Sequence, residues 1–312
     1  MPLPKSSAKT IMLLASIGIG LLFVVGFLQG AIAKGTDNAL LEKPAIHLQP
    51  IPVLESDAKI FKEEHALPNR FVLTNTILSS WITTLILLFV FFLSTRKMSL
   101  VPRGLQNLVE GVLSTMYDFV VSVTGETNAR RFFPFFATIF LFVALNAWLG
   151  LIPVYQSLGF IKDGHMERHL LRPAGTDLNM PLALAIISFV FVEYWAIKTL
   201  GLSYFGKFFR FGGLIRARSL SSLFQAGIDI FVGLLELLSE LVRIVSFTFR
   251  LFGNMTAGEI LLLVTAFLVP FVFSLPFYGL ELLVGFIQAL IFAGLTLVFV
   301  TMAIVPHEGD EH

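Results

Sequence analysis

The chain lacks cysteine and is poor in charge. None of its 312 residues is cysteine, which excludes disulfide bonds, thiolate metal sites and cysteine nucleophiles. Only 14% of the residues are charged while 56% are hydrophobic, and the mean hydropathy is +0.83. So little polar surface cannot coat a globule in water. The net charge of +1 also lacks the basic excess that binds a nucleic-acid backbone, so the composition indicates an integral membrane protein in contact with lipid.

The first apolar run covers residues 11–33 and contains no charged residue. At ~1.5 Å per residue in a helix, it is long enough to cross a hydrocarbon core of ~30 Å. Its flanks also fit a cleaved signal peptide, because Lys5 and Lys9 precede it and residues 31–33 have the small-x-small form of a cleavage site. Residues 1–33 are therefore expected to be a signal peptide or an extra membrane helix, and the length of the run favours the helix.

Residues 34–70 contain four prolines and mixed charges, which predicts an external loop. The rest of the chain, residues 71–312, is expected to form one membrane domain. Three further apolar runs predict membrane spans, at residues 71–94, 132–154 and 178–197. A polar loop is expected between the last two of these spans, over residues 156–177.

Residues 105–123 show a different pattern. Their apolar residues recur at steps of three and one, with polar and acidic residues between them. This periodicity is typical of an amphipathic helix that lies in the plane of the membrane interface. The predicted fold class is therefore an all-α integral membrane protein, with about five to six membrane helices and one interfacial helix.

Basic residues indicate the orientation of the chain. Residues 95–131 and residues 198–225 each contain five Lys or Arg, and the second segment contains no acid. The two segments are two spans apart, so they lie on the same side of the membrane. Because Lys and Arg accumulate in cytoplasmic loops, we expect both segments and the C-terminus to be cytoplasmic in a bacterial inner membrane.

The last third of the chain departs from simple hydropathy. A helical pattern continues over residues 227–268, which at ~1.5 Å per residue is roughly twice the hydrocarbon thickness. A helix of this length cannot stand upright in a bilayer. Pro270 and Pro276 predict a turn after it, and a second apolar helix is expected over residues 277–305. Residues 227–305 are therefore expected to form a long, steeply tilted helical hairpin.

This hairpin carries ionisable residues that are costly inside a membrane. On a helix of 3.6 residues per turn, six polar residues of the first arm fall within about 80° of one another; they are Asp229, Glu236, Glu240, Arg243, Arg250 and Asn254. Glu259 lies on another face, while Glu281 and Gln288 share a face of the second arm.

The two arginines of this stripe differ in their neighbours. Glu240 lies three residues before Arg243, which predicts a local ion pair. Arg250 has no carboxylate within one turn on its own helix, because Ser246, Phe247, Gly253 and Asn254 occupy those positions. A partner from another helix or subunit is therefore expected, and an unpartnered charge inside a membrane points to a functional role.

Residues 250–259 read Arg-Leu-Phe-Gly-Asn-Met-Thr-Ala-Gly-Glu. This segment closely resembles the signature of subunit a of rotary F-type ATP synthases, the membrane stator that faces the ring of c subunits. The resemblance covers roughly residues 70–305, and further matching positions are Pro102, Gln106, Glu110, residues 176–179, Glu236 and residues 288–289.

The resemblance implies a mechanism in which protons cross the membrane through two offset half-channels. It implies that Arg250 separates the half-channels and partners the ring carboxylate. The implied residues of the outer half-channel are Asn254, Glu259, Glu281 and Gln288, with Asp177 and Asn179 at its mouth, and those of the inner one are Glu236 and Ser239. Many relatives have one Glu and one His where this chain has Glu259 and Glu281.

The resemblance also implies partners: the c-subunit ring, the b subunits of the peripheral stalk and the remaining ATP synthase subunits. ATP chemistry would then reside on those other subunits, so the chain itself is expected to be non-catalytic and to need no cofactor. His165 and His169 are four residues apart, but without a nearby third ligand they predict solvated side chains and no metal site. The alternative function is a secondary ion-coupled transporter or channel, whose fold would be expected to show internal repeats.

Overall fold

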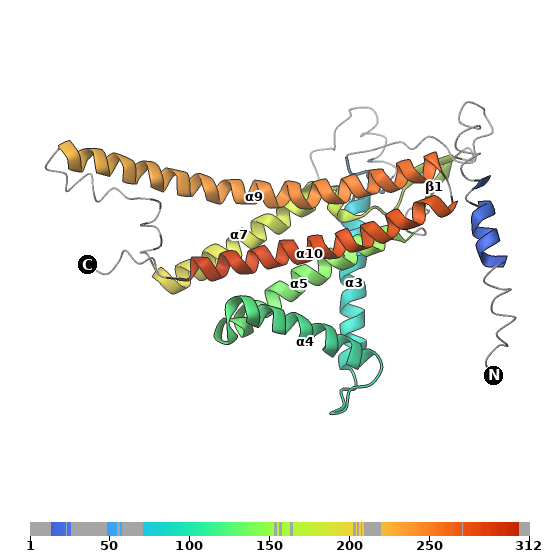
Figure 1. Ribbon diagram of the computed structural model, residues 1–312, viewed down its shortest axis with the longest axis horizontal. Helices are drawn as coiled ribbons and strands as arrows, with labels where there is room; N and C mark the ends of the chain where they lie inside the picture. The colour runs from blue at the N-terminus through green and yellow to red at the C-terminus, as the bar shows by residue number, and fades with distance from the viewer. Residues whose placement is uncertain are drawn as a thin grey trace.

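The computed structural model describes residues 14–22, 24–25, 49–54, 57, 71–152, 155, 158–162, 165–201, 204, 206, 208, 220–269 and 271–305. Most of these residues are helical. The helices, with the labels of Figure 1, are α3 (Asn75–Thr95), α4 (Leu105–Thr124), α5 (Glu126–Leu151), α7 (Asn179–Leu200), α9 (Leu220–Leu268) and α10 (Leu275–Ala303). Two short 3-10 turns, η2 (Ala174–Thr176) and η4 (Phe271–Ser274), precede α7 and α10.

Four of the described helices, α3, α5, α7 and α10, are long and apolar enough to cross a membrane. Helix α9 is the longest described helix, with 49 residues, and is therefore roughly 70 Å long. The predicted all-α membrane fold is confirmed, and the predicted long helix and its partner correspond to α9 and α10.

Helices α9 and α10 run antiparallel along the long axis of the molecule, with α9 reaching further than α10, while α3 stands across them (Figure 1). The turn between them begins after Leu268, where η4 leads into α10 with Pro276 in its first turn, a position that needs no backbone N–H. Later residues of α9 contact earlier residues of α10, as expected for antiparallel helices: Arg243 lies over the Phe299 ring, and Asn254 is bonded to Gln288. The predicted hairpin is therefore present: its two arms are in contact from Arg243 to the turn, while the first part of α9 extends beyond the end of α10 (Figure 1).

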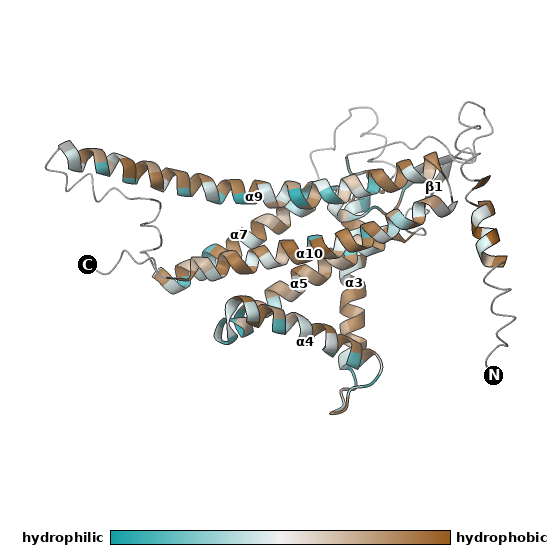
Figure 2. Ribbon diagram, in the orientation of Figure 1, coloured by the Kyte–Doolittle hydropathy of each residue, from teal (hydrophilic) through white to brown (hydrophobic). Residues whose placement is uncertain are grey.

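Helix α3 is polar on its buried side and apolar on its exposed side. Its buried residues are Asn75, Thr76, Ser79, Thr83 and Ser94. Leu85, Leu88, Phe89 and Phe92 are exposed, and Figure 2 shows apolar residues along much of this helix. Such an arrangement suits a helix that faces lipid outside and offers hydroxyl groups to its neighbours inside.

The core lies between α5 and α10, with α4, α7 and α9 around it. It is built from aromatic and small residues, among them Phe132, Phe136, Val143, Ala289 and Phe292. Small residues let the two central helices approach closely: a Cβ placed on Gly285 of α10 would lie 2.9 Å from the Cβ of Ala147 on α5.

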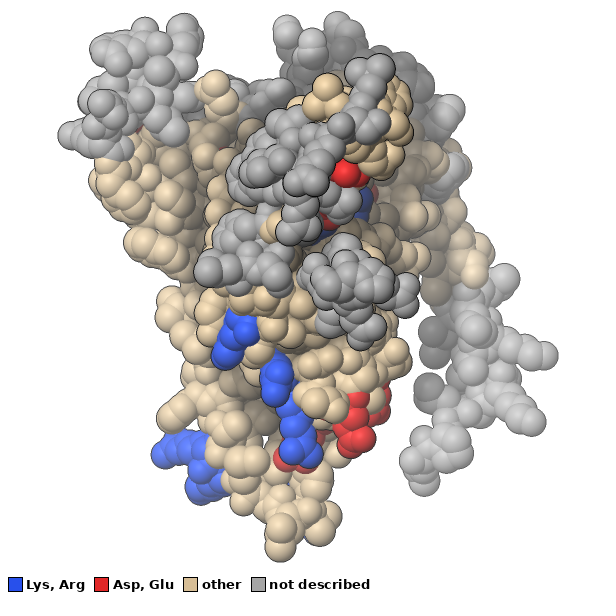
Figure 3. Space-filling view, turned by 90° about the vertical axis from the view of Figure 1, so that its left-hand side faces the viewer, with Lys and Arg blue, Asp and Glu red and all other residues tan. Residues whose placement is uncertain are grey.

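Helix α4 has the predicted amphipathic pattern. Val109, Met116 and Val120 are buried, while Leu105 and Leu108 are exposed. At its start the side chain of Gln106 bonds both the backbone of Ser99 and the carboxylate of Glu110. On the face shown in Figure 3, charged side chains gather in the lower part, at the level that α4 occupies in Figure 1.

The loop predicted over residues 156–177 is more structured than expected. It contains an antiparallel pair of strands, β1 (Gly159–Lys162) and β2 (His165–His169), followed by η2. Two helices also begin earlier than predicted, because α5 starts at Glu126 and α9 at Leu220. Residues 14–22, 24 and 25 are helical within the first apolar run; the rest of that run lies outside the described residues, so its two alternatives stay predictions.

Candidate functional site

The functional residues predicted on the hairpin fall into two groups along α9 and α10. One group extends from Asn254 toward the end of the hairpin that lies near β1 and β2, and the other lies toward the start of α9 (Figure 1). Arg250 lies between the groups. Its guanidinium donates to the Ser246 hydroxyl at 3.4 Å and lies 5.8 Å from the centre of the Phe247 ring. Among the described residues, no carboxylate forms an ion pair with Arg250. The sequence predicted this absence for the helix that carries Arg250.

Asn254 and Gln288 join the two arms of the hairpin one turn beyond Arg250. The Asn254 amide donates to the Gln288 side-chain oxygen at 2.6 Å. Gln288 is 2% exposed, and its side-chain nitrogen has no hydrogen-bond partner among the described atoms. Because a buried polar group without a partner is costly, this nitrogen indicates a place where a water molecule or a partner group can bind.

Glu281 lies against α9 at Gly258. A Cβ placed on Gly258 would overlap the Glu281 carboxylate, so only glycine at this position allows the carboxylate to approach the helix backbone so closely. Glu281 and Gln288 are two turns apart on α10 and share a face, as predicted. The polar groups of Arg250, Asn254, Gln288 and Glu281 therefore follow one another along the α9–α10 seam.

Glu259 is bound by an arginine that the sequence did not single out. The Arg172 guanidinium contacts the Glu259 carboxylate with Nη2–Oε2 at 2.6 Å and Nε–Oε1 at 3.0 Å. The two side chains are 8% and 14% exposed. Arg172 lies in the segment between β2 and η2, 87 residues from its partner. The site on α9 is therefore completed by a residue from outside the hairpin.

A network of polar side chains holds the Arg172 segment in place. The Arg172 backbone N–H donates to the Ser79 hydroxyl at 3.1 Å. Asn146 of α5 donates to the Thr83 hydroxyl at 3.1 Å and accepts from the Gly175 N–H at 3.4 Å. The backbone at Gly175 also packs against Met255, where a Cβ would lie 2.9 Å from the Met255 side chain. The ion pair is thus surrounded by groups from α3, α5, η2 and α9.

Asp177 and Asn179, the predicted mouth residues, join the start of α7 to the start of α3. Asp177 accepts from the Thr76 hydroxyl at 2.8 Å and from the Asn179 backbone N–H at 3.1 Å. Asp177 is 5% exposed, whereas Asn179 lies on the surface. Of these two residues, only Asn179 can meet solvent directly.

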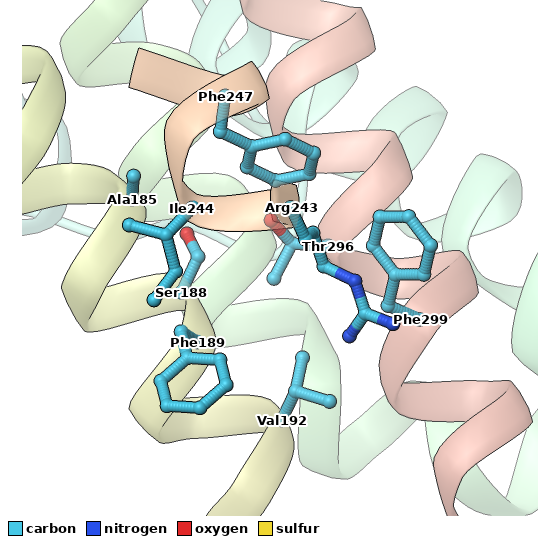
Figure 4. Close-up of a pocket in the computed structure, with 9 residues that line it drawn as sticks. All are labelled: Ala185, Ser188, Phe189, Val192, Arg243, Ile244, Phe247, Thr296 and Phe299. Atoms are coloured by element: carbon cyan, nitrogen blue, oxygen red, sulfur yellow. The ribbon is translucent and has the colours of Figure 1, made fainter. Parts of the chain in front are cut away.

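The second group contains the predicted local ion pair. Arg243 Nη1 lies 2.7 Å from Glu240 Oε2, and the guanidinium stacks 3.9 Å from the centre of the Phe299 ring (Figure 4). A cavity of about 10 Å³, near the lower limit for one water molecule, adjoins Arg243 and Ser188 between α7, α9 and α10. The Ser188 hydroxyl is buried with no hydrogen-bond partner among the described atoms.

Glu236 and Ser239, the predicted residues of the second path, lie one turn before this pair; Glu236 is half-buried and Ser239 is exposed. Close enough to the Glu240–Arg243 pair to feel its charges, Tyr204 donates to the Glu193 carboxylate at 2.9 Å. Burial and the adjacent Glu193 carboxylate raise the pKa of Tyr204, so its hydroxyl remains a donor at neutral pH.

An apolar layer separates the two groups inside the hairpin. Phe247 and Leu251 of α9 are buried, and the Phe247 ring lies 5.0 Å from the ring of Phe292 on α10. Within the described residues no cluster of three or more His, Asp or Glu could hold a metal ion. The site therefore consists of two polar groups on either side of Arg250, and packed apolar side chains lie between the two groups.

Residues 77–301 match the family described as ATP synthase A chain. The chain belongs to this family. Relatives named ATP synthase subunit a include one from Gloeobacter violaceus, 33% identical over 76% of this chain and 86% of the relative, and one from Campylobacter jejuni, 35% identical over 73% of this chain and 89% of the relative. A protein of Pelobacter propionicus named ATP synthase subunit a 1 is 34% identical over 71% of this chain and 83% of that protein.

The resemblance found in residues 250–259 is thus confirmed by the family match. Members of this family are proton-transporting subunits of the membrane sector of ATP synthases, and the apolar helices make this chain a multi-pass membrane protein. Family membership decides against the alternative of a secondary transporter.

Proposed function

We propose that the chain provides two half-channels for protons, offset along the α9–α10 hairpin and separated by Arg250, and that each opens to a different side of the membrane. The single observation that carries the proposal is the position of Arg250. It is the arginine of the hairpin that forms no ion pair with a described carboxylate, and it lies where the two polar groups meet an apolar layer.

The first half-channel follows the seam from Glu281 and Glu259 past Gln288 and Asn254 to Arg250. The contact between Asn254 and Gln288 and the approach of Glu281 to Gly258 support this course, because they place polar groups at successive turns of both helices. Asn179 stands near its mouth, and Asp177 holds the ends of α3 and α7 together there. The second half-channel begins near Arg250 and leaves past Ser239 and Glu236.

The chemistry of guanidinium explains why an arginine divides the two paths. An arginine side chain is not deprotonated in proteins, so it cannot relay a proton from one half-channel to the other. At ~4 Å and an effective dielectric constant of ~20, its charge favours an ionised carboxylate by ~4 kcal/mol. A carboxylate on a passing c subunit would therefore release its proton when it reaches Arg250, and it would be reloaded from the other half-channel.

The basic segments support the orientation. Residues 95–131 and 198–225 would lie in the cytoplasm, because each contains five Lys or Arg. The end of the molecule with β1, β2 and Arg172 would then face outward, and the half-channel through Glu281 would be the outer one. The proposed partners are the c-subunit ring at Arg250, the b subunits of the peripheral stalk and the rest of the ATP synthase.

The decisive experiment replaces Arg250. We expect Arg250→Ala to reduce proton-driven ATP synthesis in membrane vesicles by roughly 100-fold or more, since the charge that discharges the ring carboxylate is lost. Arg243→Lys is the matched control and should assemble with at least half of the parent rate. Subunit content is checked by immunoblot. Normal ATP synthesis by an assembled Arg250→Ala complex would contradict the proposal.

The orientation is tested by labelling, for which the absence of cysteine is convenient. Single cysteines at Ser99 and Ser219 should react with a membrane-impermeant maleimide only in inverted vesicles, and one at Ser157 only in intact cells. Labelling of Ser219→Cys from outside intact cells would reverse the assignment of the two half-channels.

A further inference from the structure

We propose that Arg172 is a positioning residue that holds Glu259 as a permanent carboxylate, so that Glu281 alone of the two glutamates carries the proton through the first half-channel. The inference rests on the proposed function and divides the roles of two residues that the sequence treats alike. Three features of the structure support it.

The first feature is the geometry of the ion pair. Arg172 binds Glu259 with two nitrogens, at 2.6 Å and 3.0 Å, and both side chains are largely removed from solvent. Bidentate, charge-assisted bonds of this kind are among the strongest in proteins. Since the guanidinium keeps its charge, a proton on Glu259 would leave that charge buried beside a neutral acid. Glu259 is therefore a poor carrier of protons.

The second feature is the anchoring of Arg172. Its backbone N–H is bonded to Ser79. The next residue, Pro173, packs so tightly on Gly150 of α5 that a Cβ there would overlap its ring. Gly175 packs in the same way on Met255 of α9. Because the segment is held at three points, Arg172 stays beside Glu259 while protons pass.

The third feature is the contrast with Glu281. Its carboxylate lies against Gly258, next to Glu259 in the chain, but it forms no hydrogen bond or ion pair with a described residue. It is half-buried, and it shares the face of α10 that leads to Gln288. A carboxylate in this situation can take up a proton and release it again without breaking a bond to a fixed partner.

The proton step then balances on Glu281. Its carboxylate accepts a proton from a hydronium ion on the outer side, which forms an O–H bond and leaves a water molecule. The carboxylate of the c subunit next takes that proton, and Glu281 returns to its ionised form. Arg172 and Glu259 keep their charges throughout, so their field at the seam stays constant.

Replacing the charged side chains by glutamine in the assembled ATP synthase tests the different roles assigned to Glu259 and Glu281. ATP-driven proton pumping is measured in inverted vesicles and normalised to subunit content. Arg172→Gln should lose pumping about tenfold or more, because Glu259 is left as a buried carboxylate without its ion pair. Glu281→Gln should lose at least about 50-fold, as expected for a group that transfers the proton. The double variant Arg172→Gln/Glu259→Gln should recover to within about threefold of the parent, because it removes both charges together.

Rescue by the double variant is a result that a proton-carrying Glu259 would not give, because glutamine at position 259 cannot carry a proton. A double variant as inactive as Glu259→Gln, or Glu281→Gln pumping like the parent, would overturn the inference. The charge-swapped variant Arg172→Glu/Glu259→Arg is a second test if the neutral double fails to assemble. An arginine at position 259 cannot carry a proton, so pumping above about a tenth of the parent supports the inference and its abolition overturns it.

The Arg250→Ala variant separates this test from that of the proposed function. Pumping that survives Arg250→Ala contradicts the two half-channels, whatever the Arg172 variants do. Loss of pumping in Arg250→Ala together with an inactive neutral double contradicts only the roles assigned to Glu259 and Glu281.

Discussion

Two ion pairs that involve described residues of α9 are built in different ways. Glu240 and Arg243 are three residues apart on one helix, and their pairing needs no other part of the chain. Arg172 and Glu259 are 87 residues apart and connect the segment after β2 to α9. The first pair neutralises charge within a single helix, whereas the second also fixes the position of one element on another. Two ion pairs with similar distances, 2.6 Å and 2.7 Å, can therefore have different roles: one acts within a helix and the other connects distant segments of the chain.

The largest effect is expected when the arginine of each ion pair is removed, because only one of the two pairs connects distant segments of the chain. Removing one member of a buried ion pair costs about 3–5 kcal/mol, so Arg172→Ala and Arg243→Ala should both lower the stability of the purified protein. Only Arg172→Ala should loosen the segment at η2, where Ala174 is fully buried, because it removes one of the contacts that hold that segment. A cysteine at Ala174 should then react with maleimide at least about tenfold faster in Arg172→Ala than in Arg243→Ala. Equal rates in the two variants would show that the Arg172 pair does not anchor this segment.

A smaller effect on stability is expected when the hydrogen bond of Tyr204, in the segment after α7, is removed. Tyr204→Phe removes the hydrogen bond to Glu193 and should cost about 1 kcal/mol at neutral pH. Because the pKa of Tyr204 is raised in the folded protein, its contribution is complete below the ordinary tyrosine value and is lost as the pH rises through the raised value. Thermal unfolding of both proteins from pH 7 to 11 should show the parent losing its advantage at the alkaline end. A constant difference across this range would contradict the assignment.

The smallest effect is expected when the local pair is replaced as a whole. Glu240→Leu/Arg243→Met removes both charges and keeps apolar volume against Phe299, so stability should stay within about 1 kcal/mol of the parent. Proton pumping should remain within about twofold, because this pair is not assigned a step in proton transfer. If the double variant instead stops pumping while it still assembles, Glu240 belongs to the inner half-channel, and the comparison of a structural with a functional pair has to be redrawn.

The sequence predicted one of these pairs and missed the other, for a physical reason. Periodicity places Glu240 and Arg243 on one face of a helix, so their contact follows from local geometry. The contact between Arg172 and Glu259 depends on how the chain folds back over 87 residues. A signal was nevertheless present, because Glu259 lies off the polar stripe of its helix and therefore needed a cation from another element.

The same distinction explains which parts of the fold could be predicted. Long apolar runs and the proline pair gave the spans and the α9–α10 hairpin, because hydropathy and helix length act locally. The strands β1 and β2 were missed, since four or five residues carry little periodicity. The dipeptide Asp163-Gly164 between them is a recognised hairpin signal that could have revealed them.

The apolar layer of Phe247, Leu251 and Phe292 has an electrical consequence. Voltage across a membrane falls mainly over material of low dielectric constant, so with the proposed half-channels the field would be steepest across this layer of packed side chains. Each proton that crosses a difference of 100 mV carries ~2.3 kcal/mol. A water-filled crack through these three side chains would short-circuit the membrane and release that energy as heat. In the proposed mechanism, their packing would therefore act as electrical insulation, so that protons cross only by way of the ring.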